Sequence, residues 1–228
     1  ESKRLLDLMI NSIYTHKEIF LREIISNASD AIDKLCYVAL TDDKVGMNRS
    51  DFAITVSVDK ENRTLTVSDN GIGMSREELE NNLGVIASSG SYKFRQETEE
   101  KDKKDADIDI IGQFGVGFYS AFMVADSITV RTKKYGSEQA YEWQSSGADG
   151  YTITECDKEA VGTDVIMHIK PDDDNERYSE YLQLWKLMRL IKKYSDYIRW
   201  PIQMDVTKPE YKETGEKNED GSPKFETV

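Results

Sequence analysis

The chain of 228 residues is acidic, with 43 Asp and Glu against 30 Lys and Arg and a formal net charge of −13 at pH 7. This balance argues against a nucleic-acid-binding surface, which needs clustered Lys and Arg, and no apolar run approaches the ~18 residues of a membrane span. Hydrophobic residues make up 38% and aromatic residues 10%, which suits one soluble domain with a single core.

Two helices are predicted at the start of the chain, over residues 3–14 and 19–40. On the second, Glu23, Asn27, Asp30 and Lys34 fall within about 60° of one another at 100° per residue, and apolar side chains fill the opposite arc. Such a stripe is most often a solvated face. Two carboxylates and an amide at this spacing could also place a general base beside a ligand for a hard cation.

Two strands are predicted next, over residues 52–58 and 63–68, because apolar residues alternate with polar or small ones. The loop from Asp69 to Met74 follows them, and Ser75 and Glu78 have the Ser-x-x-Glu spacing of a capping box that begins a helix. A carboxylate is therefore expected at the edge of a sheet, followed by glycines that let a flat ligand approach the backbone. Taken alone, this pattern is more often an ordinary strand-to-helix turn.

A long connection is predicted over residues 83–118, with a charged run at 97–109. Connections of this length inside a compact domain are commonly lids or disordered segments, and the glycines near both ends favour a hinged lid. Its last part, Gly112 to Phe118, can offer backbone N–H groups to phosphates ahead of a predicted helix. It is neither a Walker A loop nor a dinucleotide fingerprint, since no Gly-Lys-Ser/Thr follows and no βαβ unit surrounds it.

The remaining chain is predicted to contain an antiparallel series of strands, a helix and a final strand. The strands are expected over residues 127–133, 139–145, 151–155, 164–169 and 202–206, with the Thr163 hydroxyl near a sheet end. Helical spacing predicts that six apolar residues face the core: Tyr181, Leu184, Trp185, Met188, Ile191 and Ile198.

Three further features are the composition of the last residues, the two cysteines and the start of the chain. Residues 207–228 combine Pro and Gly with alternating Lys and Glu, the composition of a flexible, charged linker. Cys36 and Cys156 have no paired spacing, so neither a disulfide framework nor a zinc site is expected. The chain starts without Met, and we expect that an upstream piece has been removed.

Four segments, taken together and in this order, carry a family resemblance: Phe20 to Ala31, Asp69 to Met74, Asn81 to Gly84, and Ile111 to Ala125. They resemble the nucleotide-binding fold shared by DNA gyrase, the mismatch-repair MutL proteins, sensor histidine kinases and the ninety-kilodalton heat-shock chaperones. The amino-acid sequences of these segments are most similar to the bacterial type of these chaperones. The resemblance covers residues 3–206.

The resemblance implies a two-layer α/β (α+β) sandwich of the Bergerat type. A mixed, mostly antiparallel sheet would carry helices on one face and a nucleotide lid at about residues 83–118. Residues 1–206 would be an N-terminal ATP-binding domain, and residues 207–228 a charged flexible linker towards a middle domain that is absent here.

The same resemblance assigns roles to residues. Glu23 would be catalytic, orienting and deprotonating the attacking water, and Asn27 would ligate Mg²⁺. Asp69 would accept the exocyclic amine of adenine, with Thr163 supporting it directly or through water. The other nucleotide contacts implied are Asp30, Lys34, Gly73, Met74, Asn82, Leu83, Gly112, Gln113, Phe114, Gly115, Val116, Gly117 and Phe118. One departure is Ser88, where the family usually has Lys, which puts one phosphate contact in doubt.

By this resemblance the protein is expected to be a cytoplasmic stress-response chaperone that uses ATP, ADP and Mg²⁺. Lid closure and clamping of a homodimer would drive the folding of client proteins through other domains, whereas the isolated domain would be a monomer with weak ATP turnover. Two alternatives are a topoisomerase or mismatch-repair type of ATPase, and a non-hydrolysing nucleotide sensor. The acidic composition and the motifs argue against the first, and Glu23 argues against the second.

Overall fold

The computed structural model describes residues 16–84, 117–147, 150–205, 211–217 and 223–227. Its helices are α2 (Ile19–Ala39), α3 (Arg76–Leu83) and α7 (Leu184–Tyr194), with short 3₁₀ helices η2 (Asp43–Val45), η3 (Arg49–Asp51), η4 (Gly117–Met123) and η5 (Tyr178–Leu182). The strands are β1 (Ile54–Asp59), β2 (Thr64–Asp69), β3 (Ala125–Lys133), β4 (Ala140–Ser145), β5 (Tyr151–Cys156), β6 (Gly162–Ile169), β7 (Ile202–Met204), β8 (Tyr211–Lys217) and β9 (Pro223–Thr227). The helix predicted over residues 3–14 lies outside the described residues.

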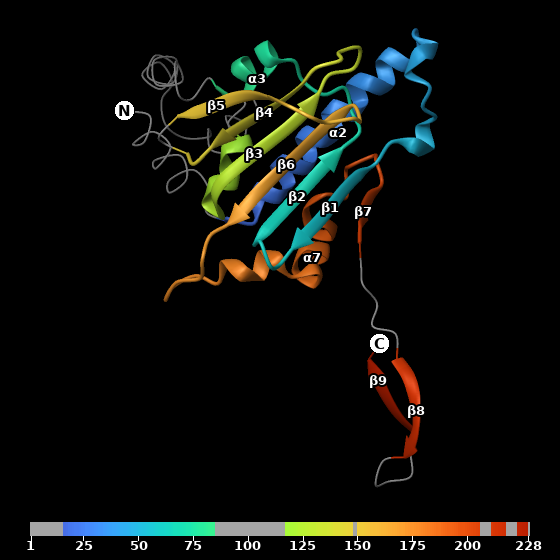
Figure 1. Cartoon of the computed structure of the whole chain (residues 1–228), viewed down its shortest axis with the longest axis vertical. Helices are drawn as coiled ribbons and strands as arrows, with labels where there is room; N and C mark the ends of the chain where they lie inside the picture. Colours follow the sequence, from blue (N-terminus) through green and yellow to red (C-terminus); the bar gives the residue numbers. More distant parts are fainter. Residues whose placement is uncertain (1–15, 85–116, 148–149, 206–210, 218–222, 228) are drawn as a thin grey trace.

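Seven strands form one sheet in the order β5-β4-β3-β6-β2-β1-β7. Every neighbouring pair is antiparallel except β1 and β7, which run parallel. In Figure 1, α2 lies along one face of this sheet, with α7 near one end and α3 near the other. The predicted mixed, mostly antiparallel α/β fold is therefore confirmed.

The first hairpin follows from the alternation in its sequence. Ile54 and Val56 on β1, and Leu65 and Val67 on β2, are almost completely buried, and Val56 pairs with Val67 across the antiparallel register. Because side chains alternate between the faces of a strand, all four point to the same face. That face is the one covered by α2.

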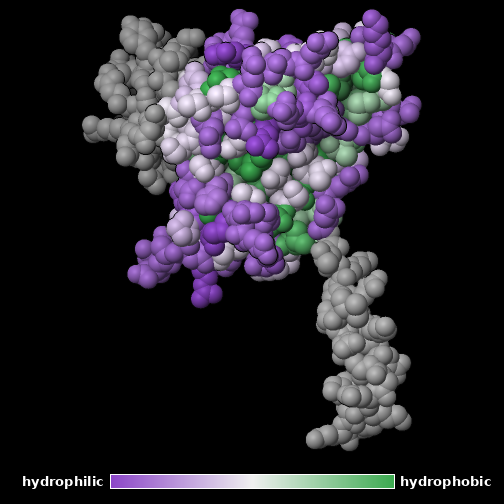
Figure 2. All heavy atoms as spheres, in the orientation of Figure 1, coloured by the Kyte–Doolittle hydropathy of each residue, from purple (hydrophilic) through white to green (hydrophobic). Residues whose placement is uncertain are grey.

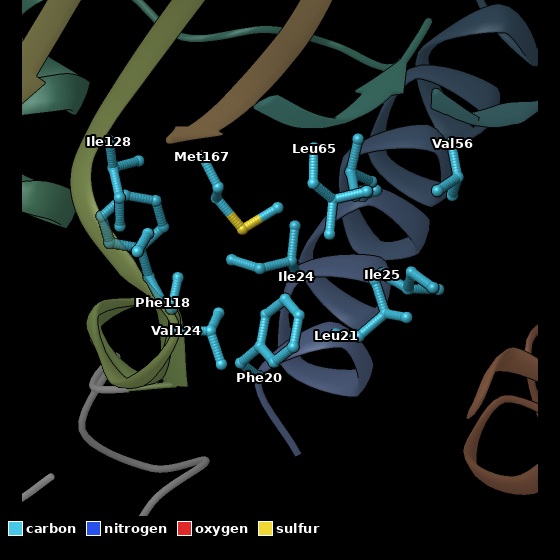
Figure 3. Close-up of a cluster of buried hydrophobic side chains, with 14 of the residues drawn as sticks. Phe20, Leu21, Ile24, Ile25, Val56, Leu65, Phe118, Val124, Ile128 and Met167 are labelled. Carbon is cyan, nitrogen blue, oxygen red and sulfur yellow. The ribbon is translucent and has the colours of Figure 1, made fainter. Parts of the chain in front are cut away.

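The core fills the space between α2 and the sheet. The buried face of α2 includes Phe20, Leu21, Ile24 and Ile25, and Figure 3 shows these side chains meeting others from β1, β2, β3, η4 and β6. The exposed face of the same helix carries Asn27, Asp30 and Lys34. The predicted amphipathic pattern of this helix is confirmed.

The helix α3 begins as its sequence predicts. The Ser75 hydroxyl accepts a hydrogen bond from the Glu78 N–H at 3.2 Å, and the Glu78 carboxylate accepts one from the Ser75 N–H at 2.7 Å. This reciprocal capping satisfies two N–H groups that a helix start leaves without partners. It sets where the loop that follows Asp69 must end.

The predicted core face of the last helix is wrong for two residues. Trp185 and Met188 are 56% and 52% exposed, whereas Leu187 and Leu190 are 0% and 2% exposed. The expected single helix is divided, because η5 ends at Leu182 and α7 starts at Leu184. The helical periodicity of apolar residues therefore cannot be counted continuously from η5 into α7. As a result, the buried face of α7 includes Leu187 and Leu190 and not Trp185.

Four further observations concern the C-terminal residues, the cysteines, the surface and the helices. Residues 211–217 and 223–227 pair as an antiparallel two-stranded sheet, although no strands were expected there; the role of this region as a linker stays a prediction. Both cysteines are free thiols. Charged and polar residues cover most of the face seen in Figure 2. Among the described residues, none of the helices has the length and apolar character to cross a bilayer.

Candidate functional site

Three polar side chains form a row across neighbouring strands at one end of the sheet. Asp69, the last residue of β2, pairs with Thr163 on β6, and Thr163 pairs with Thr132 on β3. Residues two positions earlier or later along these strands, such as Val67 and Val130, belong to the core. Since strand side chains alternate between faces, the row lies on the helix-covered face, where Thr132 and Thr163 are buried.

The Asp69 carboxylate is in an environment that disfavours its charge. Burial raises the pKa of Asp69 to about 7, with a further increase from the nearby Asp164. Hydrogen bonding from the Gly71 N–H, at 2.8 Å, acts in the opposite direction. A partly buried carboxyl group with a strongly shifted pKa at the end of a sheet is typical of a site that binds or transforms a ligand.

The loop after Asp69 is held closely on both sides by the backbone. The Ile72 N–H donates to the Ala31 carbonyl of α2 at 3.0 Å, and the Ile72 carbonyl accepts from the Tyr135 N–H at 2.8 Å. A Cβ on Gly71 would clash with the Ala31 backbone, and one on Gly73, which has φ +67°, would clash with Lys133. Glycine is required here because the loop lies directly on its neighbours.

The polar stripe of α2 supplies a second group of functional candidates. Asn27, Asp30 and Lys34 are exposed, while the Glu23 side chain is only 14% exposed. The Arg22 guanidinium donates to Glu23 Oε1 at 2.6 Å, and the Glu23 carboxylate also lies against Gly117. Although Asp30 is largely exposed, partial desolvation of its carboxylate, and to a lesser degree Asp33, raises the pKa of Asp30. The helix thus presents a carboxylate and an amide one turn apart.

The remaining described candidates lie around α3 and η4. Asn82 is exposed, and its amide contacts the Met74 sulfur at 3.8 Å. Leu83 is buried, and its carbonyl accepts a hydrogen bond from the Tyr119 hydroxyl. Phe118 is 4% exposed and its ring packs edge-on against Trp143 at 5.5 Å. In this structure Phe118 therefore contributes to the core.

The predicted site residues fall into those that the structure describes and those that it does not. The structure brings Asp69, Thr163 and the Gly73 loop together at the sheet end, and brings Glu23 to the start of η4. The predicted contacts at Gly112, Gln113, Phe114, Gly115 and Val116, together with Ser88 and most of the predicted lid, lie outside the described residues.

The side chains of the candidate site can be tested for whether they suit Mg²⁺. In the described ranges there is no group of three or more His, Cys, Asp or Glu residues that could hold a metal by itself. Mg²⁺ in nucleotide sites keeps several waters and takes only one or two protein ligands besides the phosphates. The exposed Asn27 amide, one helical turn from Glu23, is compatible with such a site.

Sequence reasoning missed Thr132. Its hydroxyl accepts a hydrogen bond from the Met74 N–H at 2.8 Å and lies 3.0 Å from the Thr163 hydroxyl. A threonine within an alternating strand carries no local signal of such a role, because its partners come from a loop 58 positions earlier and a strand 31 positions later. It also missed the contact of Arg22 with Glu23.

Comparisons with known proteins show which family and which proteins the chain is similar to. A family model described as "Histidine kinase-, DNA gyrase B-, and HSP90-like ATPase" matches residues 14–166. The chain is 58% identical over 228 residues to "Chaperone protein HtpG" of Clostridium botulinum (strain Langeland / NCTC 10281 / Type F), covering 100% of this chain and 36% of the relative. It is 61% identical over 219 residues to the protein of the same name from Bacillus licheniformis, covering 96% of this chain and 34% of the relative. The chain thus spans about a third of the length of the curated relatives it matches.

Proposed function

Because the chain belongs to the histidine kinase-, DNA gyrase B- and HSP90-like ATPase family, we propose that it is the ATP-binding and ATP-hydrolysing domain of a bacterial chaperone. The relatives that share 58% to 61% identity with it are named as chaperones, which favours this function over a topoisomerase or mismatch-repair ATPase. The observation that carries the proposal is the partly buried Asp69 carboxylate beside Thr163, at the end of the sheet, with a pKa raised to about 7.

In the proposed site, Asp69 accepts a hydrogen bond from the exocyclic amine of adenine. A carboxylate oxygen accepts from an N–H donor, and burial makes the loss of that bond costly. Thr163, on the neighbouring strand, supports the same base. Gly73, Met74, Asn82 and Leu83 would line the adenosine part of the site, and the Phe118 ring would have to leave the core to join them.

The hydrolytic side of the proposed site lies on α2. Glu23 would take a proton from water as the water oxygen bonds to the γ-phosphorus and the bond to ADP breaks. Its position fits this role, since one oxygen is held by Arg22 and the carboxylate faces the start of η4. Mg²⁺, held by Asn27, would neutralise charge on the phosphates. Asp30 and Lys34 would contribute contacts around the ribose and the metal's waters, and the backbone from Gly112 to Gly117 would bind phosphates.

The wider activity belongs to the longer protein. We propose a cytoplasmic homodimer in which ATP binding closes a lid over residues 83–118 and clamps client proteins, with residues 207–228 linking this domain to the next. The isolated chain would then be a monomer that binds nucleotide better than it hydrolyses it. A purely sensing role is disfavoured because a sensor has no use for a carboxylate at Glu23.

Calorimetric titration with ATP and ADP, with and without Mg²⁺, tests the nucleotide site directly. Asp69→Asn should abolish binding of both nucleotides, because both present the same base to this residue. Asp126→Asn is the matched control, since Asp126 lies at the opposite end of β3 and pairs with His168; it should bind like the parent. Near-parental affinity in the Asp69 variant would remove the basis of the proposal.

A further inference from the structure

Thr132 occupies the centre of a hydrogen-bond network that connects three separate parts of the domain. Its Oγ1 accepts from the Met74 N–H at 2.8 Å, lies 3.0 Å from Thr163 Oγ1, and lies 3.3 Å from the Gly162 carbonyl. The residue is 0% exposed. The loop after Asp69, the start of β6 and the end of β3 therefore share one buried hydroxyl group.

A single hydroxyl proton limits how this network can be arranged. Thr132 has one O–H and two acceptor positions, and the Met74 N–H occupies one of these positions. Its proton can go to Thr163 at 3.0 Å or to the Gly162 carbonyl at 3.3 Å. If Thr132 donates its proton to Thr163, the shorter of the two contacts, the Thr163 hydroxyl keeps its own proton for another partner. That proton can then point away from Thr132 and towards Asp69, which pairs with Thr163 from the neighbouring strand β2.

We propose that Thr132 is a positioning residue that determines base specificity, because it holds the Thr163 hydroxyl as a donor beside the Asp69 acceptor. This inference rests on the proposed nucleotide site. Adenine presents the complementary pair on adjacent atoms, an amine that donates and a ring nitrogen that accepts. Hypoxanthine, the base of ITP, presents the reverse pair, a carbonyl that accepts and a ring N–H that donates. The network therefore predicts that ATP is preferred over ITP through Thr132, although Thr132 need not contact the base.

The substitution Thr132→Val keeps the shape of the side chain and removes its hydroxyl. It leaves the Met74 N–H without its partner and frees the Thr163 hydroxyl to rotate and present a lone pair. A buried polar group without a partner costs about 1–3 kcal/mol, or roughly 5- to 150-fold in an equilibrium constant. The loss at the Met74 N–H falls on the stability of the fold, because it is the same with and without nucleotide, whereas the loss of a fixed Thr163 donor towards the base falls on nucleotide affinity. We expect ATP affinity to fall by about 10-fold or more and the ratio of ATP to ITP affinity to fall by a similar factor.

Two variants separate positioning from general damage. Thr132→Ser retains the hydroxyl and should restore both the ATP affinity and the ATP-to-ITP ratio to within a few-fold of the parent. Thr129→Val changes a threonine on the same strand whose neighbour Val130 faces the core, so its side chain lies on the other face; it should leave both quantities unchanged. Melting temperatures of all variants, measured without nucleotide, report whether each one folds.

Calorimetric titration of each variant with ATP and ITP gives outcomes that can be told apart. If the parent chain binds neither ATP nor ADP, the proposed function itself is wrong. If the parent binds ATP and Thr132→Val keeps the parental ATP-to-ITP ratio, or Thr132→Ser fails to restore it while remaining folded, the role of Thr132 is refuted. The role of Thr132 is supported if the ratio of ATP to ITP affinity falls in Thr132→Val and recovers in Thr132→Ser.

Discussion

The Glu23 carboxylate lies against Gly117, in the space that a Cβ at residue 117 would occupy. Glu23 stands on α2 and Gly117 begins η4, so two elements 94 positions apart meet at the proposed catalytic group. The atom that a larger residue would meet first is Glu23 Oε2, the far end of a flexible side chain. A substitution at Gly117 should therefore move the carboxylate rather than disrupt the fold.

The first prediction concerns Gly117→Ala in the full-length protein. ATP turnover should fall by about 10-fold or more, because small displacements of a catalytic group reduce rates strongly. ATP affinity should change by no more than a few-fold, since the backbone N–H is retained. Steady-state turnover and calorimetric titration measure the two quantities. Parental turnover in a folded Gly117→Ala protein would show that the position of Glu23 is not important for chemistry.

The second prediction concerns Glu23→Ala. In the full-length protein, turnover should fall by about 10²-fold or more, the scale expected for a positioned general base, while ATP affinity stays close to the parental value. Adding Gly117→Ala to this variant should cause little further loss, because both changes act on the same group. Additive losses would indicate that Gly117 acts on something other than Glu23.

The third prediction concerns pH. Burial raises the pKa of Asp69 from 3.8 to about 7, so the folded state binds a proton that the unfolded state has released between these values. This stability is fully present below about pH 3.8 and is lost progressively as the pH rises to about 7, with a slope of at most about 1.4 kcal/mol per pH unit.

Urea denaturation without nucleotide, repeated from pH 5 to pH 8, measures this effect. The free energy of unfolding of the parent, relative to Asp69→Asn, should decrease from pH 5 to about pH 7 and level off above it. The same substitution at the exposed Asp174 serves as the control and should leave the pH dependence of the parent intact. A pH-independent difference between the parent and Asp69→Asn would contradict the raised pKa.

The fourth prediction compares two glycines with positive φ. Gly162, at φ +126°, lies against the Asp69 backbone, and a Cβ there would also come within 2.9 Å of Asn70 Cα; Gly136, at φ +80°, has open space around it. Gly136→Ala should cost about 1 kcal/mol from backbone strain alone. Gly162→Ala should cost at least about 3 kcal/mol, since overpacking adds to strain, and should weaken ATP binding as well. Equal losses of stability would mean that β6 and the loop after Asp69 can separate without cost.

The fifth prediction tests the buried face of α7. Leu187→Ala should lower the free energy of unfolding by about 2–5 kcal/mol, the range for a buried leucine. Met188→Ala, at a residue that is 52% exposed, should change it by no more than about 0.5 kcal/mol. Denaturant unfolding of both variants measures the difference. A larger loss of unfolding free energy in Met188→Ala than in Leu187→Ala would support the buried face that residue spacing alone predicts.

Local patterns by themselves determined much of this protein. The period of apolar residues identified the buried face of α2 and the strands of the first hairpin, and the Ser75–Glu78 spacing identified where α3 begins. These features depend on residues within a few positions of one another, which is why periodicity and capping rules predict them. The resemblance of the four segments added the fold and the candidate site residues.

Only the tertiary structure decided which distant groups meet. The strand order puts β6 between β2 and β3, and this order alone aligns Asp69, Thr163 and Thr132 in one row. The break between η5 and α7 changed the helix phase and exposed Trp185, and the contact of Glu23 with Gly117 joins α2 to η4. Such contacts arise from the packing of elements that are far apart along the chain, and hydrophobic period carries no information about which elements become neighbours.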